Sequence, residues 1–276
     1  MANESETAPT WGAQLTHAAR LLASAGSPAP QQEAAELLGH LLGMPVTTLA
    51  ARPETPMRQD DIQTFASWVA RRMGGVPTPY ITGHLEFMGL DIAVGLESPL
   101  PLPGAQRLVE EALRWARLHA RGELSAAEMG TGCGAVSLAL AALEPRFTRI
   151  YALDASMDAL AKARVNGARY LLNLVITWLD GRDLATVPEP VDLVICGQRD
   201  LLAAAVERLS QAPANLRPGG ALICAIPLAQ RQEAEDALRA AGPATLFWVE
   251  SAGGEPAIAV AQFAQHTGSD DVLSEG

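Results

Sequence analysis

From residue 125 to residue 263 the sequence alternates between short apolar runs and amphipathic stretches, and this alternation constrains the fold more than any other feature. Apolar runs of about four to eight residues are typical of buried strands, whereas the stretches between them carry apolar residues at helical spacing. Such alternation predicts a parallel sheet with helices on both faces. The segments are, in order, "AAEMG", "AVSLALAAL", "RIYALD", "MDALAKARVNGARYLL", "LVITWLD", "VDLVICG", "LLAAAVERLSQAPANL", "ALICAIP" and "QRQEAEDALRAAG".

The alternation ends with two strands that have no helix between them. "TLFWVES" and "PAIAVAQF" are joined by "AGGE", which is too short for a helix, so these runs predict an antiparallel hairpin at the sheet edge. The polar residues 265–276 are expected to form a disordered tail.

The first part of the chain has a helical pattern throughout. Helices are expected over residues 11–26, 30–45 and 60–75, the second with an apolar face of Ala35, Leu38, Leu41 and Leu42. We therefore expect four parts: a helical domain at 1–78, a hairpin and proline-rich connector at 79–105, a sheet domain at 106–264 and the tail at 265–276.

Composition excludes several classes of function. The net charge of -11 opposes binding to phosphate backbones, so no nucleic-acid partner is expected. No run of about 18 uncharged apolar residues is present, which argues against a membrane span. The acidic start "MANESETAPT" does not resemble a signal peptide, so a cytoplasmic location is expected. The three cysteines are odd in number and lie in or beside expected core segments, which predicts reduced thiols, and they lack the paired spacing of a metal site.

A glycine-rich loop, "EMGTGCGAV", joins the first strand of the sheet domain to the next helix. Glycines let a ligand approach the backbone, and the N–H groups at a helix start can bind it. Gly130, Gly132 and Ala135 also match the dinucleotide-binding fingerprint, and Asp154 ends the following strand, where an acid accepts hydrogen bonds from a ribose. The loop alone leaves both ligand classes open.

Two features favour S-adenosylmethionine over a dinucleotide. Glu128 places a carboxylate before the first glycine, where it would repel a pyrophosphate and attract the ammonium of an amino acid. The terminal hairpin also departs from a purely parallel dinucleotide domain. An alternative is a glycine-rich turn without a ligand, with Asp154 as a helix cap.

With these residues assembled, the chain resembles class I S-adenosylmethionine-dependent methyltransferases, and more narrowly the release factor glutamine methyltransferase family. The narrower resemblance rests on "EAAELLGHLLG", on "GGVPTPYITGHLEFMGLDIAV" and on the order of helical domain, connector and Rossmann-like catalytic domain. It implies that Asp154 holds the ribose and that Asp180 lies near the adenine, unless Asp180 is only a solvated turn residue. The loop beneath the cofactor's methionine would be Gly130, Thr131, Gly132, Cys133 and Gly134. "LRPGG", at 216–220, matches a turn before the fifth strand.

The sequence departs from the family pattern at two places. Where the family ends its fourth strand with Asn-Pro-Pro-Tyr, this chain has Gly197, Gln198, Arg199 and Asp200. The resemblance implies that the asparagine and a neighbouring carbonyl hold the substrate's glutamine amide. Where the family reads Arg-Pro-Asp/Glu-Thr-Glu, this chain has "LPGAQ" at 102–106, without a charge.

Three interpretations of the segment "GQRD" remain open. The chain can methylate a different acceptor, oriented by Gln198 or Asp200 with Arg199 binding an anionic group. It can instead be a catalytically inactive homologue that binds the cofactor or a protein. In the third interpretation these side chains only cap and solvate the helix expected from residue 201. The resemblance also implies a protein substrate or translation factor docked by the helical domain.

Overall fold

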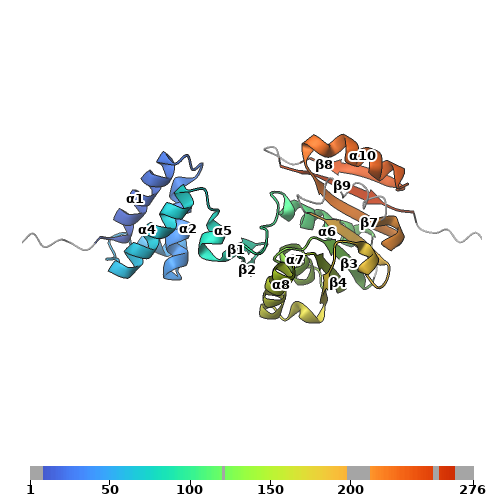
Figure 1. The fold of residues 1–276 in the computed structure, drawn as a ribbon, viewed down its shortest axis with the longest axis horizontal. Coiled ribbons are helices and arrows are strands. Elements are labelled where there is room, and N and C mark those ends of the chain that lie inside the picture. Colours follow the sequence, from blue (N-terminus) through green and yellow to red (C-terminus); the bar gives the residue numbers. More distant parts are fainter. Residues whose placement is uncertain (1–8, 120–121, 198–211, 251–254, 265–276) are drawn as a thin grey trace, which may run out of the picture. The chain divides into compact units, whose positions relative to one another are not determined.

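The computed structural model describes residues 9–119, 122–197, 212–250 and 255–264 (Figure 1). The chain divides into two compact units, Met1–His84 and Leu85–Gly276. The four-part division expected from the sequence places its first boundary at residue 78, and it stays a prediction.

The first unit is helical. Its core joins Leu22 of the first helix, Leu37 and Leu38 of the second, and Phe65 of the fourth. Thr10 caps the first helix by accepting a hydrogen bond from the Ala13 N–H at 3.3 Å. The helices are α1 (Trp11–Ser24), α2 (Pro30–Leu42), α3 (Val46–Ala51), α4 (Gln59–Met73) and α5 (Thr78–Thr82).

The three helices expected in this region are confirmed, but the buried face of α2 is rotated from the expected one. Ala34, Leu37 and Leu38 are fully buried, whereas Leu41 and Leu42 are half-buried. The reason is that α2 packs against both α1 and α4, so the residues that face these two helices are the buried ones. The helices α3 and α5 were not expected.

The hairpin expected within residues 79–105 consists of β1 (His84–Phe87) and β2 (Leu90–Ala93), and Met88 and Gly89 form its turn. Met88 and Gly89 have φ values of 53° and 82°. Positive φ at both central residues suits the twist of a two-residue hairpin turn.

The second unit contains a seven-stranded sheet in the order β5-β4-β3-β6-β7-β9-β8. The first five strands of this order run parallel, and β9 runs antiparallel to both β7 and β8. The expected Rossmann-like sheet with an antiparallel C-terminal hairpin is therefore confirmed. The strands are β3 (Leu124–Met129), β4 (Phe147–Asp154), β5 (Ile176–Asp180), β6 (Val191–Cys196), β7 (Leu216–Ile226), β8 (Thr245–Val249) and β9 (Ala257–Gln262).

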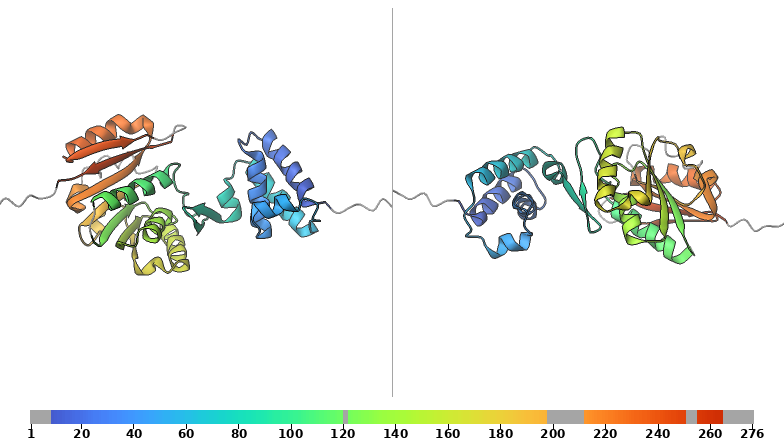
Figure 2. Two further views of the ribbon diagram at one scale, coloured as in Figure 1. Left: turned by 180° about the vertical axis from the view of Figure 1, so that it is seen from behind. Right: turned by 90° about the horizontal axis from the view of Figure 1, so that it is seen from below.

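Helices cover both faces of this sheet (Figures 1 and 2). On one face Ala234 and Leu238 of α10 pack into the same core as Met129 and Leu153. On the other face Ser137 of α7 reaches Glu128, whose side chain points away from that of Met129 because neighbouring strand residues alternate. The helices are α6 (Ala105–His119), α7 (Ala135–Leu143), α8 (Met157–Arg169) and α10 (Arg231–Ala240).

The strand β7 begins earlier than expected. The segment 216–220, interpreted as a turn, belongs to this strand, and Leu216 pairs with Val191 of β6. An irregular register follows between Val191 and Leu193, next to Gly219, whose φ is 83°. An irregular register of this kind lets the strand continue through "RPGG". Of the helix expected over 201–216, residues 201–211 lie outside the described part of the chain, and Ala212–Asn215 form a short 3-10 turn.

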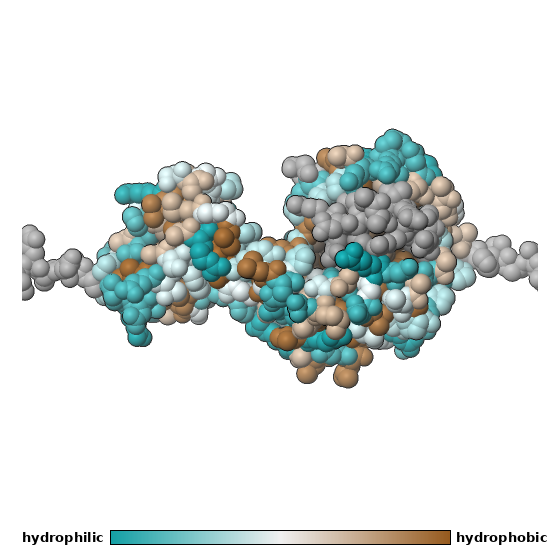
Figure 3. Space-filling model, viewed as in Figure 1, coloured by the Kyte–Doolittle hydropathy of each residue, from teal (hydrophilic) through white to brown (hydrophobic). Residues whose placement is uncertain are grey.

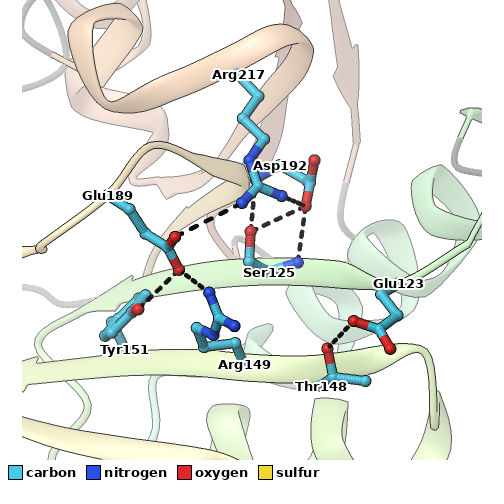
Figure 4. Close-up of polar contacts among 8 residues, drawn as sticks. All are labelled: Glu123, Ser125, Thr148, Arg149, Tyr151, Glu189, Asp192 and Arg217. Carbon is cyan, nitrogen blue, oxygen red and sulfur yellow. Dashed lines mark hydrogen bonds and ion pairs between the residues drawn. The ribbon is translucent and has the colours of Figure 1, made fainter.

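A polar network joins the amino-terminal parts of four strands, β3, β4, β6 and β7 (Figure 4). Asp192 Oδ2 accepts hydrogen bonds from the N–H of Ser125 at 2.8 Å, from the Ser125 hydroxyl at 2.9 Å and from Arg217 at 3.0 Å. Glu189 pairs with Arg149, and this hydrogen bond lowers the pKa of the Glu189 carboxyl. The network lies at the sheet edge opposite the carboxyl ends of the parallel strands.

The turn after α8 exposes two large apolar side chains. Leu171 is 80% exposed and Leu174 is 94% exposed, and Leu171 has a φ of 58°. Figure 3 shows hydrophobic surface below α8 at this end of the unit. In the described part of the chain no helix is both long and apolar enough to cross a membrane.

Candidate active site

The glycine loop lies between β3 and α7, at the carboxyl edge of the sheet. The N–H groups of Gly130 and Thr131 both donate to the carbonyl of Leu153, at 2.7 and 2.8 Å. These bonds fix the loop against the end of β4. The φ values of Gly130 and Gly132 are 74° and 54°, a region that side chains disfavour, so the loop requires glycine at these positions.

Gly134 is restricted by a close neighbour as well as by its backbone. Its φ is 84°, and a Cβ atom there would lie 3.0 Å from Cη2 of Trp178. A side chain at Gly134 would therefore push against the indole ring of β5. Trp178 is held in turn by a hydrogen bond from its indole N–H to Asn173 at 2.9 Å.

Asp154 is buried beside the loop. Its Oδ2 accepts a hydrogen bond from the Gly132 N–H at 2.8 Å, and its Oδ1 accepts one from the Ser156 N–H at 2.9 Å. A carboxylate is an acceptor of the kind that ribose hydroxyls bind. Asp180 pairs with Asp154 in the register of β4 and β5 and is exposed, which brings both acids to one edge.

Glu128 ties the loop to the first turn of α7. Its Oε2 accepts hydrogen bonds from the Thr131 hydroxyl at 2.8 Å, from the Ser137 N–H at 3.0 Å and from the Ser137 hydroxyl. Burial raises the pKa of the Glu128 carboxyl, and the bonds from Ser137 and Thr131 oppose that rise. The Thr131 side chain is thus engaged by Glu128.

The three cysteines are buried and form no disulfide, in line with the expected reduced thiols. Burial raises the pKa of the Cys133 thiol to about 11, and it raises the pKa of Cys224 well above its usual value. A thiol with a raised pKa is a poor nucleophile at neutral pH. The Cys133 thiol is therefore not expected to act as a nucleophile.

Asn166 is a site residue that sequence reasoning missed. Its side chain is buried in α8, where Nδ2 donates to the carbonyls of Ala93 and Cys133, both at 2.9 Å, and Oδ1 accepts from the Ala93 N–H at 2.9 Å. One amide therefore joins the end of β2 to the glycine loop. The available signal was an asparagine, a poor helix former, in the middle of an expected helix.

The end of β6 lies against the start of α6. Gly197 follows Cys196, and a Cβ atom on Gly197 would lie 2.8 Å from Cδ2 of the buried Leu108. Gln198, Arg199 and Asp200, the rest of the segment singled out in the sequence, lie outside the described residues. In the described part of the chain no cluster of three potential metal ligands is found.

Comparisons with known proteins agree with this arrangement. Residues 13–83 match the model of the PrmC N-terminal domain, and residues 126–220 match a methyltransferase domain. A release factor glutamine methyltransferase of Moorella thermoacetica is 34% identical over 255 residues, which cover 83% of this chain and 89% of that relative. The chain belongs to the release factor glutamine methyltransferase family.

Other relatives of this family match over shorter lengths. The release factor glutamine methyltransferase of Aliivibrio fischeri is 34% identical over 154 residues, 56% of this chain and 53% of that relative. Among solved structures, the ribosomal protein L11 methylase of Lactobacillus delbrueckii matches with a TM-score of 0.51 and 20% identity over 62% of this chain and 85% of that one. This last likeness shows the fold alone. As a member of the family, the chain is an S-adenosylmethionine-dependent methyltransferase.

Proposed function

We propose that the cofactor lies over the glycine loop and that the chain methylates an acceptor other than the glutamine of a release factor. The proposed cofactor residues are Glu128, Gly130, Thr131, Gly132, Cys133, Gly134, Asp154 and Asp180.

The residues present fit S-adenosylmethionine. Ligands of open α/β sheets bind outside the carboxyl ends of the strands, where the loop, Asp154 and Asp180 lie. Gly130 and Gly132 have no side chains that would keep a ligand from the loop backbone, and the Asp154 carboxylate is an acceptor suited to ribose hydroxyls. The Asp154 carboxylate beside the loop disfavours a pyrophosphate and favours an ammonium group, and Glu128 adds to this where its carboxyl is ionised. When bound, the cofactor supplies a methyl group on a positively charged sulfur.

The observation that carries the cofactor proposal is the hydrogen bond from the Gly132 N–H to Asp154 Oδ2, at 2.8 Å. It holds the loop and the acid at one place, so a ligand on the loop lies within reach of the carboxylate. The alternative of a mere helix cap accounts for the bond to Ser156 but not for this one.

Isothermal titration tests the cofactor proposal. S-adenosylmethionine should release heat on binding, and NAD should not. Asp154→Ala should weaken binding by about 10- to 100-fold, which corresponds to about 1–3 kcal/mol for ligand hydroxyls left without a partner. Asp158→Ala, which removes an exposed acid from the first turn of α8, is the matched control and should bind as the wild type does. Unchanged affinity in Asp154→Ala would exclude the ribose role.

The acceptor proposal rests on Gly197. Glycine offers no side-chain amide or carboxylate to hold a glutamine, and the space beside it is filled by Leu108. Residues 102–106, which lead into α6, carry no charged group either. An amide nitrogen is a weak nucleophile whose reaction depends on accurate positioning, so the loss of both groups favours a different acceptor.

We further propose that the helical unit docks a translation factor. A shallow hollow, open to solvent, lies between α1 and α4 and is lined by Leu21, Phe65, Val69 and Met73 among others. Its apolar lining suits a side chain of a protein partner. Ala66→Arg, within the hollow, should reduce binding of a release factor measured by surface plasmon resonance, whereas Gln63→Arg on the same helix outside the hollow should not.

A further inference from the structure

A carboxylate lies beside the residue that precedes α6. Oε2 of Glu255 is 3.8 Å from the position that a Cβ atom would take on Gly104. Gly104 has a φ of 85°, so its backbone favours glycine. The space next to position 104 therefore holds the acid of Glu255, which comes from a distant part of the sequence.

This place lies at the same edge of the sheet as the end of β6. Glu255 precedes β9, whose first residue, Ala257, pairs with Ile226 at the carboxyl end of β7. The carbonyl of Gly104 accepts the N–H of Leu108 at 3.0 Å, and Leu108 lies against Gly197. Gly104, beside which Glu255 lies, is thus about one helical turn from the leucine that touches the strand end where the acceptor is expected.

The segment that leads into α6 beside this carboxylate is uncharged. Gly104 and Gly197 have no side chains, and residues 99–105 are uncharged. Glu250, on the same hairpin, is paired with Arg231, but the described residues give Glu255 no ion pair or hydrogen bond. Glu255 is also exposed, so a ligand can reach its oxygens.

We propose that Glu255 is a specificity-determining residue that positions a cationic nitrogen acceptor, the ammonium of a lysine or the guanidinium of an arginine. This inference rests on the proposed function, because it names the acceptor class of the same site. A carboxylate binds a charged N–H donor through a charge-assisted hydrogen bond, which is stronger than a bond to a neutral amide.

The proton balance is compatible with this role. An ammonium nitrogen has no lone pair, so it must release one proton before its nitrogen can form the new bond to carbon. A guanidinium likewise loses one N–H proton as the bond to the methyl carbon forms. In both cases the proton goes to water, and the Glu255 carboxylate only holds the nitrogen through its remaining N–H groups. The electron pair of the broken carbon–sulfur bond stays on the sulfur.

Four short peptides, each acetylated and amidated with one central lysine, arginine, glutamine or serine between glycines, provide the test. Each peptide is titrated by NMR into the full chain saturated with the demethylated cofactor product, and transfer is measured with methyl-labelled S-adenosylmethionine. The lysine or the arginine peptide should bind at least about 10-fold more tightly than the glutamine and serine peptides. Methyl transfer should be fastest to the peptide that binds most tightly. Comparison of the lysine and arginine peptides shows which of these two side chains is the acceptor.

Substitutions separate this role from a structural one. Glu255→Gln should lose the preference for the basic peptide, Glu255→Asp should keep part of it, and Glu250→Gln should keep all of it. All three should retain the wild-type cofactor affinity and melting temperature. Equal binding of the basic and glutamine peptides, an unchanged preference in Glu255→Gln, or no binding of any peptide would overturn the proposal. Absence of cofactor binding in the wild type would instead refute the proposed function.

Discussion

Leu108 of α6 fills the space beside Gly197 of β6, with Cδ2 at 2.8 Å from the position of a Cβ on that glycine. Leu108 is fully buried, so the leucine cannot move into solvent when a larger residue is introduced. The space that a side chain at Gly197 would occupy is therefore taken by Leu108 of α6. The two positions should behave as a coupled pair.

Gly197→Asn should lower the free energy of unfolding by about 1–3 kcal/mol, because it overpacks the core against Leu108. Leu108→Ala should cost about 2–5 kcal/mol by leaving a cavity. In the double variant the asparagine occupies that cavity, so the total cost should be smaller than the sum of the two. Urea denaturation of the four proteins measures the coupling, and strictly additive costs would show that the two residues do not compete for space.

Asn166→Asp should weaken binding of S-adenosylmethionine by at least about 10-fold, since it places a carboxylate oxygen against the carbonyls of Ala93 and Cys133. The chain should also lose about 2–4 kcal/mol of stability, because the new charge is buried without a partner. Asn173→Asp, at an exposed asparagine that also bonds a backbone carbonyl, is the control and should have the smaller effect on both. Titration and urea denaturation give the two readouts, and a wild-type affinity for Asn166→Asp would disprove the coupling between β2 and the loop.

Glu128→Gln should change how stability depends on pH. Burial raises the pKa of Glu128 above its ordinary value of 4.5, so the folded chain holds a proton that the unfolded chain releases. Stability from this group is therefore lost as the pH rises from about 4.5 through the raised folded value. The amide oxygen of the glutamine variant can accept the same hydrogen bonds without this loss, so its advantage in stability over the wild type should grow between pH 5 and pH 8. If the two proteins differ in stability by the same amount at every pH in that range, the raised pKa of Glu128 would be contradicted.

The same variant separates stability from binding. If Glu128 attracts the cofactor's ammonium, Glu128→Gln should bind S-adenosylmethionine about 10-fold or more weakly at pH 7.5 while being no less stable. A variant that is more stable and binds equally well would show that Glu128 only ties Thr131 and Ser137 together.

Asp192→Ala should destabilise the chain without affecting the cofactor. The substitution leaves the buried N–H of Ser125 without its partner and removes the ion pair with Arg217, at a cost of about 1–3 kcal/mol. Affinity for S-adenosylmethionine should stay at the wild-type value because the network lies at the opposite sheet edge. Asp236→Ala, at an exposed position of α10, serves as control. Weaker binding of S-adenosylmethionine by Asp192→Ala would mean that changes at one sheet edge alter the cofactor site at the other.

Much of the fold follows from local patterns. The apolar runs ending at Met129 and Asp154, with glycines after the first, predict parallel strands and a loop at their carboxyl ends. The seven-stranded sheet confirms this, because the periodicity reports which faces are buried. The short link after Val249 likewise predicts the antiparallel pair, although not that β9 lies inside the sheet and β8 at its edge.

The partners of the site residues were not predictable in this way. Contacts between Asn166 and Ala93, between Leu108 and Gly197, and between Glu255 and Gly104 join residues far apart in sequence. No local spacing specifies such pairs, since they depend on how helices pack across the sheet. The partners of Glu128 were also not predictable. Its charge suggested contact with a ligand, whereas its hydrogen bonds to Ser137 depend on how α7 packs against the sheet.

Repair of one side of the acceptor site should not restore the family's activity. Replacing Gly197, Gln198, Arg199 and Asp200 by Asn-Pro-Pro-Tyr leaves residues 102–106 without charge and Leu108 in place. Transfer to a release factor should therefore stay undetected in this graft. Activity restored by the graft alone would show that the end of β6 is the whole difference from the family.

The most direct test of this account is methyl transfer from labelled S-adenosylmethionine to a release factor, with the unmodified chain and an intact family enzyme assayed side by side. The account predicts label in the release factor with the control enzyme and a rate at least about 100-fold lower with this chain, because a weak nucleophile has lost the groups that position it. Label incorporated at a comparable rate would contradict the account and would show that another group of this chain holds the glutamine amide.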